Sequence, residues 1–209
     1  MRLLVIDTAT QALSVALLHG GRFVEGFHDI VGRGHAEALL PAIAGLPEGG
    51  RADAIAVAVG PGSFTGVRIG IAAARALALG WAIPVHGYST PALIAAQAAR
   101  QHEGGGPIVV TMTGGHGELF WQIFDENGRH SSAPAASAPI AVLAEQLAAK
   151  VFYGTGAEAL VTARGAGTAI TLYPNAADYA LISDLPPLPP SPVYGRGADA
   201  KTMAERAAA

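Results

Sequence analysis

The glycine-rich segment 60–70 is the part of the sequence best suited to binding a ligand. Its sequence is Gly-Pro-Gly-Ser-Phe-Thr-Gly-Val-Arg-Ile-Gly, and it lies between the apolar run 54–59 and a helical pattern. Backbone N–H groups at the start of a helix attract anions, and glycines allow a phosphate to approach the backbone closely. The same glycines also suit a tight turn, so the segment predicts either an anion site or a purely structural turn.

Known phosphate-binding and nucleophile motifs differ from this segment in their spacing. A Walker loop requires a lysine directly after its last glycine, whereas Val67 follows Gly66. The dinucleotide fingerprint leaves two residues before its third glycine, but three residues separate Gly62 from Gly66. A nucleophile elbow needs a glycine two residues after its serine, and Thr65 occupies that position after Ser63. The segment therefore predicts none of these three sites.

Few other residues offer catalytic chemistry. Asp7 ends the apolar run 3–6, where its carboxylate could contact a ligand or cap its own turn, and the sequence leaves both roles open. Glu118 begins an alternating segment and is more typical of a solvated edge residue than of a catalytic one. The seven histidines include no H-x-x-x-H or H-E-x-x-H spacing and cysteine is absent, so we expect neither a metal site nor thiol chemistry.

Short apolar runs and helical patterns alternate through the first half of the chain. Gly20-Gly21 between two β-prone runs predicts a hairpin, so we expect a three-stranded antiparallel meander at the start. Helices are expected where apolar residues recur at helical spacing before glycine or proline. The expected strands are 3–6, 13–18, 22–27, 54–59 and 84–86, and the expected helices are 35–46, about 67–79 and 91–101.

The glycines at 104–106, followed by Pro107, form the clearest linker. After it we expect strands at 108–112, 118–124 and 151–153, and helices at 142–149, after residue 156 and at 199–208. This repeated order predicts an α/β protein of two similar lobes, each a mixed sheet flanked by helices. We expect residues 1–103, joined by a C-terminal helix at 199–209, to form one lobe and residues 104–198 to form the other.

The composition excludes several classes of protein. The chain has 209 residues, of which 51% are hydrophobic and 14% charged, and its formal net charge is −3. Its 13 lysines and arginines are scattered rather than gathered in a basic stripe, so we expect no direct tRNA binding by this chain alone. No run of 18 apolar residues is present and the N-terminal apolar run is too short for a signal peptide, which predicts a cytoplasmic protein without membrane contact.

The helical pattern over residues 66–80 predicts an interface with another protein. Its only charges are two arginines, and it is otherwise apolar nearly all round, more than packing on one sheet requires. Small residues recur at Gly66, Gly70 and Ala74, a spacing that lets another helix approach closely. Burial within its own lobe is the alternative. The residues predicted for the interface, from this helix and the preceding one, are His35, Leu39, Ile43, Gly66, Val67, Gly70, Ile71 and Ala74.

Several segments resemble the bacterial TsaB (YeaZ) family. The matching segments of the first half are residues 1–10, His35 with Leu40-Pro41, and above all the glycine segment 60–70. The second half matches more weakly, at Gly117–Trp121, which resembles the family's G-E-V-Y-W strand, and at Pro192–Tyr194 with Arg196, which resembles its P-x-Y-x-R element.

This resemblance implies an actin-like ATPase (ASKHA) fold in two lobes and a role in making threonylcarbamoyladenosine beside the tRNA anticodon. In this family the chain is the non-catalytic partner of TsaD, a paralogue that holds the metal and transfers the carbamoyl group, and the ATPase TsaE joins them. It implies a helical surface that pairs with the matching helices of a TsaD-like subunit, and a homodimer when that partner is missing. A stand-alone ASKHA-type kinase or ATPase, or a glycoprotease-like metallohydrolase, is the alternative.

ASKHA folds bind nucleotide between their lobes, so the resemblance also implies a weak site for ATP or ADP and no other cofactor. Two departures from the family affect this expectation. Thr113-Gly114-Gly115 replaces the usual D-A-R, which removes polar groups from the cleft, and residues 47–50 replace a longer first helix and connection. The residues expected nearest the nucleotide are Asp7, Thr8, Gly60, Gly62, Ser63 and Thr65.

Overall fold

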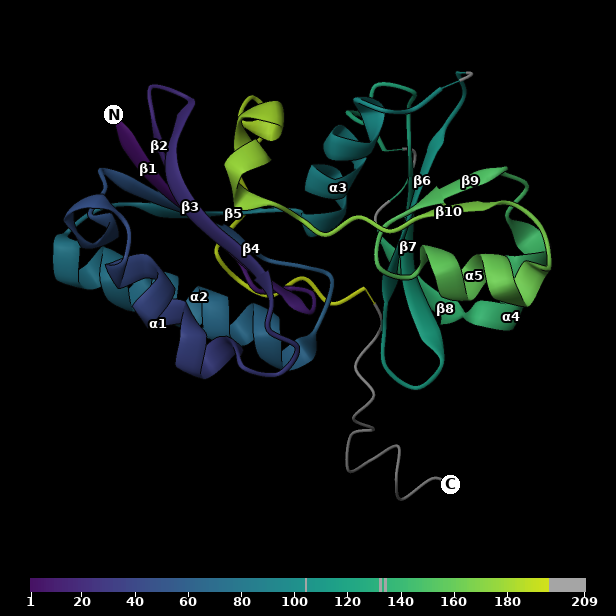
Figure 1. The fold of residues 1–209 in the computed structure, drawn as a ribbon, viewed down its shortest axis with the longest axis horizontal. Coiled ribbons are helices and arrows are strands. Elements are labelled where there is room, and N and C mark those ends of the chain that lie inside the picture. Colours follow the sequence, from purple (N-terminus) through teal and green to yellow (C-terminus); the bar gives the residue numbers. More distant parts are fainter. Residues whose placement is uncertain (104, 132, 134, 196–209) are drawn as a thin grey trace, which may run out of the picture.

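The chain folds into two five-stranded mixed sheets of the same topology (Figure 1). The computed structural model describes residues 1–103, 105–131, 133 and 135–195. The strand order is β3-β2-β1-β4-β5 in the first sheet and β10-β9-β6-β7-β8 in the second. Each sheet therefore joins a three-stranded antiparallel meander to two parallel strands, which confirms two similar lobes.

The first sheet contains the expected meander and the two strands expected after it. Its strands are β1 (Arg2–Asp7), β2 (Ala12–His19), β3 (Arg22–Ile30), β4 (Ala54–Ala58) and β5 (Val85–Tyr88). β2 and β4 are buried almost throughout, as strands covered on both faces must be. β3 is exposed along most of its length because it forms the open edge of the sheet.

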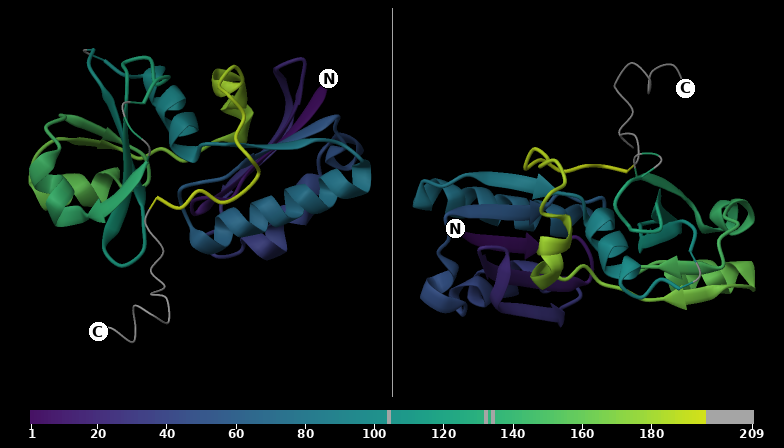
Figure 2. Two further views of the ribbon diagram at one scale, coloured as in Figure 1. Left: turned by 180° about the vertical axis from the view of Figure 1, so that it is seen from behind. Right: turned by 90° about the horizontal axis from the view of Figure 1, so that it is seen from above.

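Two helices cover one face of the first sheet (Figure 1, Figure 2). They are α1 (His35–Ala44) and α2 (Phe64–Trp81), and a 3₁₀ turn, η1 (Pro47–Gly50), follows α1. Each helix buries residues three or four positions apart, which is the pattern of an amphipathic helix on a sheet. α2 begins three residues before its expected start because the Ser63 hydroxyl accepts the Gly66 N–H at 3.1 Å and caps the helix.

The second sheet contains two strands that the sequence did not predict. Its strands are β6 (Ile108–Thr113), β7 (Glu118–Phe124), β8 (Ala136–Pro139), β9 (Val151–Tyr153) and β10 (Thr168–Ile170). The unpredicted β8 and β10 have four and three residues, too few for an alternating pattern to stand out. The helices α4 (Ile140–Gln146) and α5 (Ala157–Arg164) pack beside this sheet, where Leu143 and Leu160 meet Phe152 in a common core.

Two further elements link the lobes. α3 (Thr90–Ala99) packs against β6 of the second sheet, and η2 (Ala176–Ile182), a 3₁₀ segment, returns to the first sheet. η2 covers the face opposite α1 and α2 (Figure 1, Figure 2). The Ala176 N–H donates to Ser14 Oγ at 2.8 Å, and Tyr179 joins the first core. The assignment of all of residues 104–198 to one lobe is therefore wrong for η2, because only the fold brings these distant residues together.

The C-terminal helix expected at residues 199–209 and the matching Arg196 lie outside the described residues. Among the helices that the structure describes, none has the length and apolar character needed to cross a membrane.

The close approach of α2 to the turn after β1 requires glycine in the helix. A Cβ atom on Gly66 would lie 2.1 Å from the Thr8 carbonyl oxygen, and one on Gly70 would lie 2.4 Å from Thr8 Oγ1. The Thr8 hydroxyl also donates to the Gly66 carbonyl at 2.7 Å, so a buried hydrogen bond joins helix and turn. Gly66 and Gly70 therefore face the sheet of their own lobe.

Replacing Gly66 with alanine should destabilise the chain by about 1–3 kcal/mol, because the new methyl group overlaps a backbone oxygen that cannot rotate away. Gly80 is the matched control, since it lies in the same helix and a Cβ there meets nothing within 4 Å. Gly80→Ala should be neutral or raise the stability by up to about 1 kcal/mol. Urea unfolding followed by circular dichroism measures both changes, and equal stabilities would contradict the tight packing of α2 on Thr8.

Candidate functional site

The glycine segment lies directly on the turn that follows β1. The Ser63 N–H donates to the Ala9 carbonyl at 2.8 Å, and a Cβ on Gly62 would lie 2.3 Å from that same oxygen. Thr8 is bonded to the first turn of α2 through Gly66. Two segments about fifty residues apart in sequence are thus held in contact. The close packing against the turn accounts for Gly62 and Gly66, because a side chain at either position would overlap it.

Asp7 lies in the interior next to this contact and has protein partners for both carboxylate oxygens. Asp7 Oδ1 accepts the Ala9 N–H at 2.9 Å, and Oδ2 lies 3.1 Å from the Tyr88 hydroxyl. Burial raises the pKa of Asp7 from 3.8 to about 7, and these two hydrogen bonds offset only part of that rise. Asp7 therefore caps its own turn, the structural role that the sequence left open.

The hydrogen bonds around Tyr88 favour a protonated Asp7. The Tyr88 hydroxyl has one hydrogen, but its oxygen lies within hydrogen-bonding distance of both Asp7 Oδ2 and the Ile6 carbonyl, at 3.1 and 3.2 Å. When Asp7 carries a proton, it can donate to the Tyr88 oxygen while Tyr88 donates to Ile6, and every polar atom of the group has a partner. When Asp7 is ionised, its carboxylate accepts the hydrogen bond from the Tyr88 hydroxyl, and Tyr88 then has no hydrogen to donate to the Ile6 carbonyl.

The fold brings the predicted nucleotide-binding residues together, but their side chains do not all line a site that is open to solvent. Asp7 and Thr8 are 0% and 1% exposed, and their polar atoms bind protein groups. Ser63 and Thr65 are exposed, and Ser63 already binds a free N–H of the first helical turn. Asp7 and Thr8 are therefore withdrawn from solvent in this structure. Weak binding of ATP or ADP beside the exposed part of the segment stays a prediction.

The structure forms an exposed cluster at the start of α2 that was not expected from the sequence. The guanidinium carbon of Arg68 lies 3.3 Å from the centre of the Phe64 ring and 5.2 Å from that of Tyr194. The two rings stack with centroids 6.1 Å apart, and Phe64 is 66% exposed. The four-residue spacing of Phe64 and Arg68 on a helix could have revealed that pair. No sequence signal links Tyr194 to them.

All of the residues predicted for the partner interface are buried within the chain itself. They are His35, Leu39, Ile43, Gly66, Val67, Gly70, Ile71 and Ala74. His35 Nε2 lies 3.2 Å from the Ala12 carbonyl oxygen, and the apolar members join the core of the first lobe. That prediction is wrong, because the small residues bring α2 close to its own sheet. The alternative of burial within the lobe is the correct one.

The sides of α1 and α2 turned away from the core are open to solvent, and on α2 they combine apolar residues with Arg68 and Arg75. Leu40 is 54% exposed and Leu79 is 85% exposed. The exposed or half-exposed apolar residues of this outer face are Ala36, Leu40, Ala44, Ile69, Ala72, Ala73, Ala76 and Leu79. The same two helices thus present an apolar surface, but with different residues from those predicted.

The residues that depart from the family pattern lie at the turn between β6 and β7. The Thr113 N–H donates to Thr155 Oγ1 at 3.0 Å, and Thr113 Oγ1 donates to the Thr155 carbonyl at 3.0 Å. The expectation that Glu118 is a solvated edge residue is wrong. β8 pairs with β7 on that side, and the Ser137 hydroxyl donates to the Glu118 carboxylate. Within the described part of the chain, no three His, Asp or Glu side chains are grouped as metal ligands.

Replacing Asp7 with asparagine should change how stability depends on pH. Folded Asp7 keeps its proton up to about pH 7, whereas the unfolded side chain loses it near its ordinary pKa of 3.8. Folding therefore takes up a proton in this interval, and the wild type should lose stability as pH rises, by up to about 1.4 kcal/mol per pH unit relative to Asp7→Asn.

Asparagine keeps an acceptor for the Ala9 N–H and does not titrate, which makes it a suitable comparison. Urea unfolding of both proteins at several pH values between about 4.5 and 7.5 measures the difference. Parallel stability curves would show that Asp7 is ionised in the folded chain throughout.

The chain is similar to named proteins from several bacteria. It is 41% identical over 135 residues to the tRNA threonylcarbamoyladenosine biosynthesis protein TsaB of Escherichia coli, which covers 61% of this chain and 58% of that protein. It is 38% identical over 109 residues to the protein of the same name from Haemophilus influenzae, covering 49% of this chain and 45% of that one. The chain thus spans about half the length of these curated relatives.

Solved structures extend the similarity to nearly the whole chain. An uncharacterized protein with similarity to peptidase YEAZ, from Pseudomonas aeruginosa, has a TM-score of 0.77 at 32% identity and covers 93% of this chain and 99% of its own. The ethanolamine utilization protein EutJ from Carboxydothermus hydrogenoformans has a TM-score of 0.51 at 14% identity, covering 88% and 90%. That likeness concerns the fold alone, and it confirms the expected two-lobed actin-like class.

One family model matches most of the chain. The model described as TsaD: tRNA N6-adenosine threonylcarbamoyltransferase matches residues 29–173. Together with the TsaB relatives and the YeaZ structure, this match confirms the resemblance that the glycine segment carried. The chain belongs to the TsaB/YeaZ family of TsaD-related proteins.

Proposed function

We propose that this chain is a non-catalytic subunit required for threonylcarbamoyladenosine formation on tRNA, and that it binds and supports a TsaD-like catalytic subunit. Its relatives are named for biosynthesis of this modified nucleoside, and the TsaD family model matches its own sequence. A TsaE-like ATPase is the third component that we propose for the assembly.

The observation that carries the proposal is the outer face of α1 and α2. Leu40 and Leu79 are large apolar side chains exposed to solvent, and both helices also expose small alanines. An apolar surface of this kind is typical of a protein interface rather than of a monomer. The small side chains allow the backbone of a partner helix to come close, and the leucines provide apolar area at the edges.

The family relationship suggests what the partner presents to this surface. Because a TsaD-like subunit shares the family of this chain, it is expected to carry two helices at the equivalent place. Two similar helical pairs can meet about an approximate twofold axis and form a four-helix contact, and two copies of this chain can do the same when the partner is missing.

The burial of Asp7 and its hydrogen bonds to protein groups support a non-catalytic role. In an actin-like fold an acidic residue at the end of the first strand is the natural candidate to act on a bound phosphate or metal. Here that carboxyl group is buried and bound to Ala9 and Tyr88. We therefore expect the isolated chain to hydrolyse ATP or peptides negligibly. Turnover at roughly 1 per second or more would instead favour a stand-alone kinase, ATPase or metallohydrolase.

Ala72→Glu should weaken binding to a TsaD-like subunit at least tenfold, because it places a charge in the middle of the apolar outer face of α2. Ala141→Glu is the matched control, since it introduces the same charge at an exposed alanine of α4 in the other lobe. Calorimetry with each variant and the TsaD-like subunit of the same organism measures affinity, and circular dichroism verifies folding. Equal binding by both variants would place the interface elsewhere.

The role in the modification is tested separately by leaving out one component at a time. Cells or reconstituted mixtures that lack this chain should contain no threonylcarbamoyladenosine in digested tRNA, as measured by mass spectrometry. Adding back the wild type or Ala141→Glu should restore the nucleoside, and adding Ala72→Glu should not. Normal levels of the nucleoside without this chain would reject the proposed function.

A further inference from the structure

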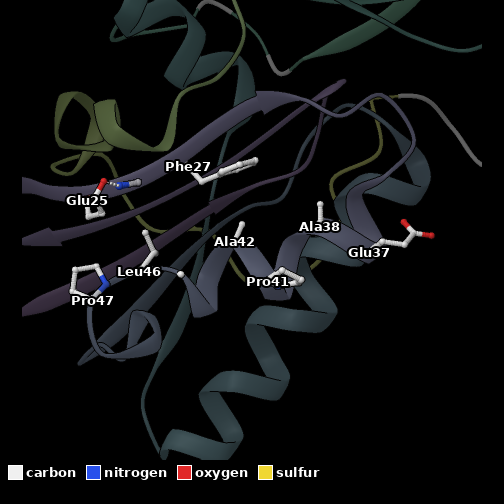
Figure 3. A pocket seen from close by; sticks show the side chains of 10 residues that line it. Glu25, Phe27, Glu37, Ala38, Pro41, Ala42, Leu46 and Pro47 are labelled. Atoms are coloured by element: carbon white, nitrogen blue, oxygen red, sulfur yellow. Dashed lines mark hydrogen bonds between the residues drawn. The ribbon is translucent and has the colours of Figure 1, made fainter.

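A groove of about 750 Å³ runs between the edge strand β3 and helix α1, on the side of α1 away from its outer face (Figure 3). Glu25, Gly26 and Phe27 line the strand side. Glu37, Ala38, Pro41 and Ala42 line the helix side, and residues 45–47 close one end.

The groove is open because the residues that face it are small. α1 is fixed to the sheet by Leu39 and Ile43, which are buried in the core. On the side turned toward β3 it carries Ala38 and Ala42, whose methyl groups do not reach the strand (Figure 3). Phe27 is consequently 38% exposed, and apolar surface lines the space between helix and strand.

The polar groups of the groove are acceptors and carry negative charge. Glu25 and Glu37 lie toward its opposite ends (Figure 3), and neither forms an ion pair with any described residue. Pro41 lies inside α1 and has no N–H, so the Glu37 carbonyl lacks its usual helical donor. A complementary ligand therefore has an apolar middle and cationic, hydrogen-donating groups on either side.

The strand beside the groove is able to accept another strand. β3 is the last strand of its sheet, and it exposes Phe23, Val24 and Ile30 in addition to Phe27. Two of its N–H groups are held by neighbouring carboxylates, Gly26 by Glu25 at 3.4 Å and Ile30 by Asp29 at 2.8 Å. These local bonds protect the edge against indiscriminate pairing. Cations near these carboxylates would draw them away and free both N–H groups for the carbonyls of an incoming strand.

We propose that the groove between β3 and α1 is a docking site for an extended peptide segment in which an apolar residue has a lysine or arginine two positions before it and another two positions after it, so that all three side chains lie on the face turned toward the groove. The segment adds to the edge of the first sheet, places an apolar side chain between Phe27 and Ala42, and pairs its cations with Glu25 and Glu37. This site is separate from the outer face of α1 and α2, so it can be occupied together with the partner proposed for that face.

A labelled synthetic peptide, acetyl-Thr-Lys-Thr-Leu-Thr-Lys-Thr-amide, tests the proposal with the full chain. Fluorescence anisotropy should show saturable binding that weakens with added salt. The same peptide with glutamate in place of lysine should not bind. No saturable binding of the basic peptide would reject the site.

Neutralising the groove separates a specific site from general charge attraction. Glu25→Gln combined with Glu37→Gln should weaken binding at least tenfold. Glu145→Gln combined with Glu158→Gln removes the same charge from exposed positions on α4 and α5, and it should change binding less than twofold. An equal loss in both double variants would show that only net charge matters, and this would overturn the proposal.

Filling the groove tests the place of binding. Ala42→Phe should abolish binding while leaving the unfolding transition measured by circular dichroism in place. On the wild type, peptide-induced NMR shifts should be confined to residues 23–30 and 37–47, a measurement that does not depend on any variant folding. Shifts centred on another surface would also overturn the proposal.

Discussion

The contact between α2 and the turn after β1 is the constraint on which the first lobe depends. At Gly66 and Gly70 the helix comes so close to Thr8 that a side chain of any size would overlap it. This proximity fixes the loop from β4 into α2 and places the buried Asp7 beneath it. It also turns Gly66, Gly70 and Ala74 toward the sheet, so the apolar residues on the far side of α2 remain available to solvent or to another protein.

The buried polar groups of the first lobe extend from this contact through the sheet. Asp7 is bound to Tyr88, the edge of the Tyr88 ring meets Tyr179 with centroids 5.2 Å apart, and the Tyr179 hydroxyl lies 3.0 Å from His86 Nε2. Tyr179 belongs to η2, which covers the other face of the sheet. Packed rings and hydrogen bonds thus form a continuous path from Asp7 to the segment that closes the lobe from behind.

Helix α1 serves a different purpose on each of three sides. His35, Leu39 and Ile43 hold it to the sheet. Ala36, Leu40 and Ala44 belong to the outer apolar face. Glu37, Ala38, Pro41 and Ala42 form one wall of the groove beside β3. Because residues four apart lie above one another on a helix, ten residues can present these three sides without conflict. Of the residues of α1, only His35, Leu39 and Ile43 are buried and therefore inaccessible to another protein.

Patterns local in the sequence determined much of this protein. Residues 3–6 of β1 and all of β4 are apolar, and Gly20-Gly21 marks the first hairpin, so the meander and the α/β class follow from short-range chemistry. The glycine segment 60–70 also identified the family.

The tertiary structure decided which way each pattern faces. The apolar, small-residue character of α2 fits a partner helix and its own sheet equally well, and only the position of Thr8 resolves this in favour of the sheet. Tyr194 joins Phe64, and Ala176 joins Ser14, across more than 120 residues, with no spacing rule to connect them. The type of a side chain indicates whether it tends to be buried. Which part of the protein buries it depends on contacts between distant segments, and these contacts exist only once the chain has folded.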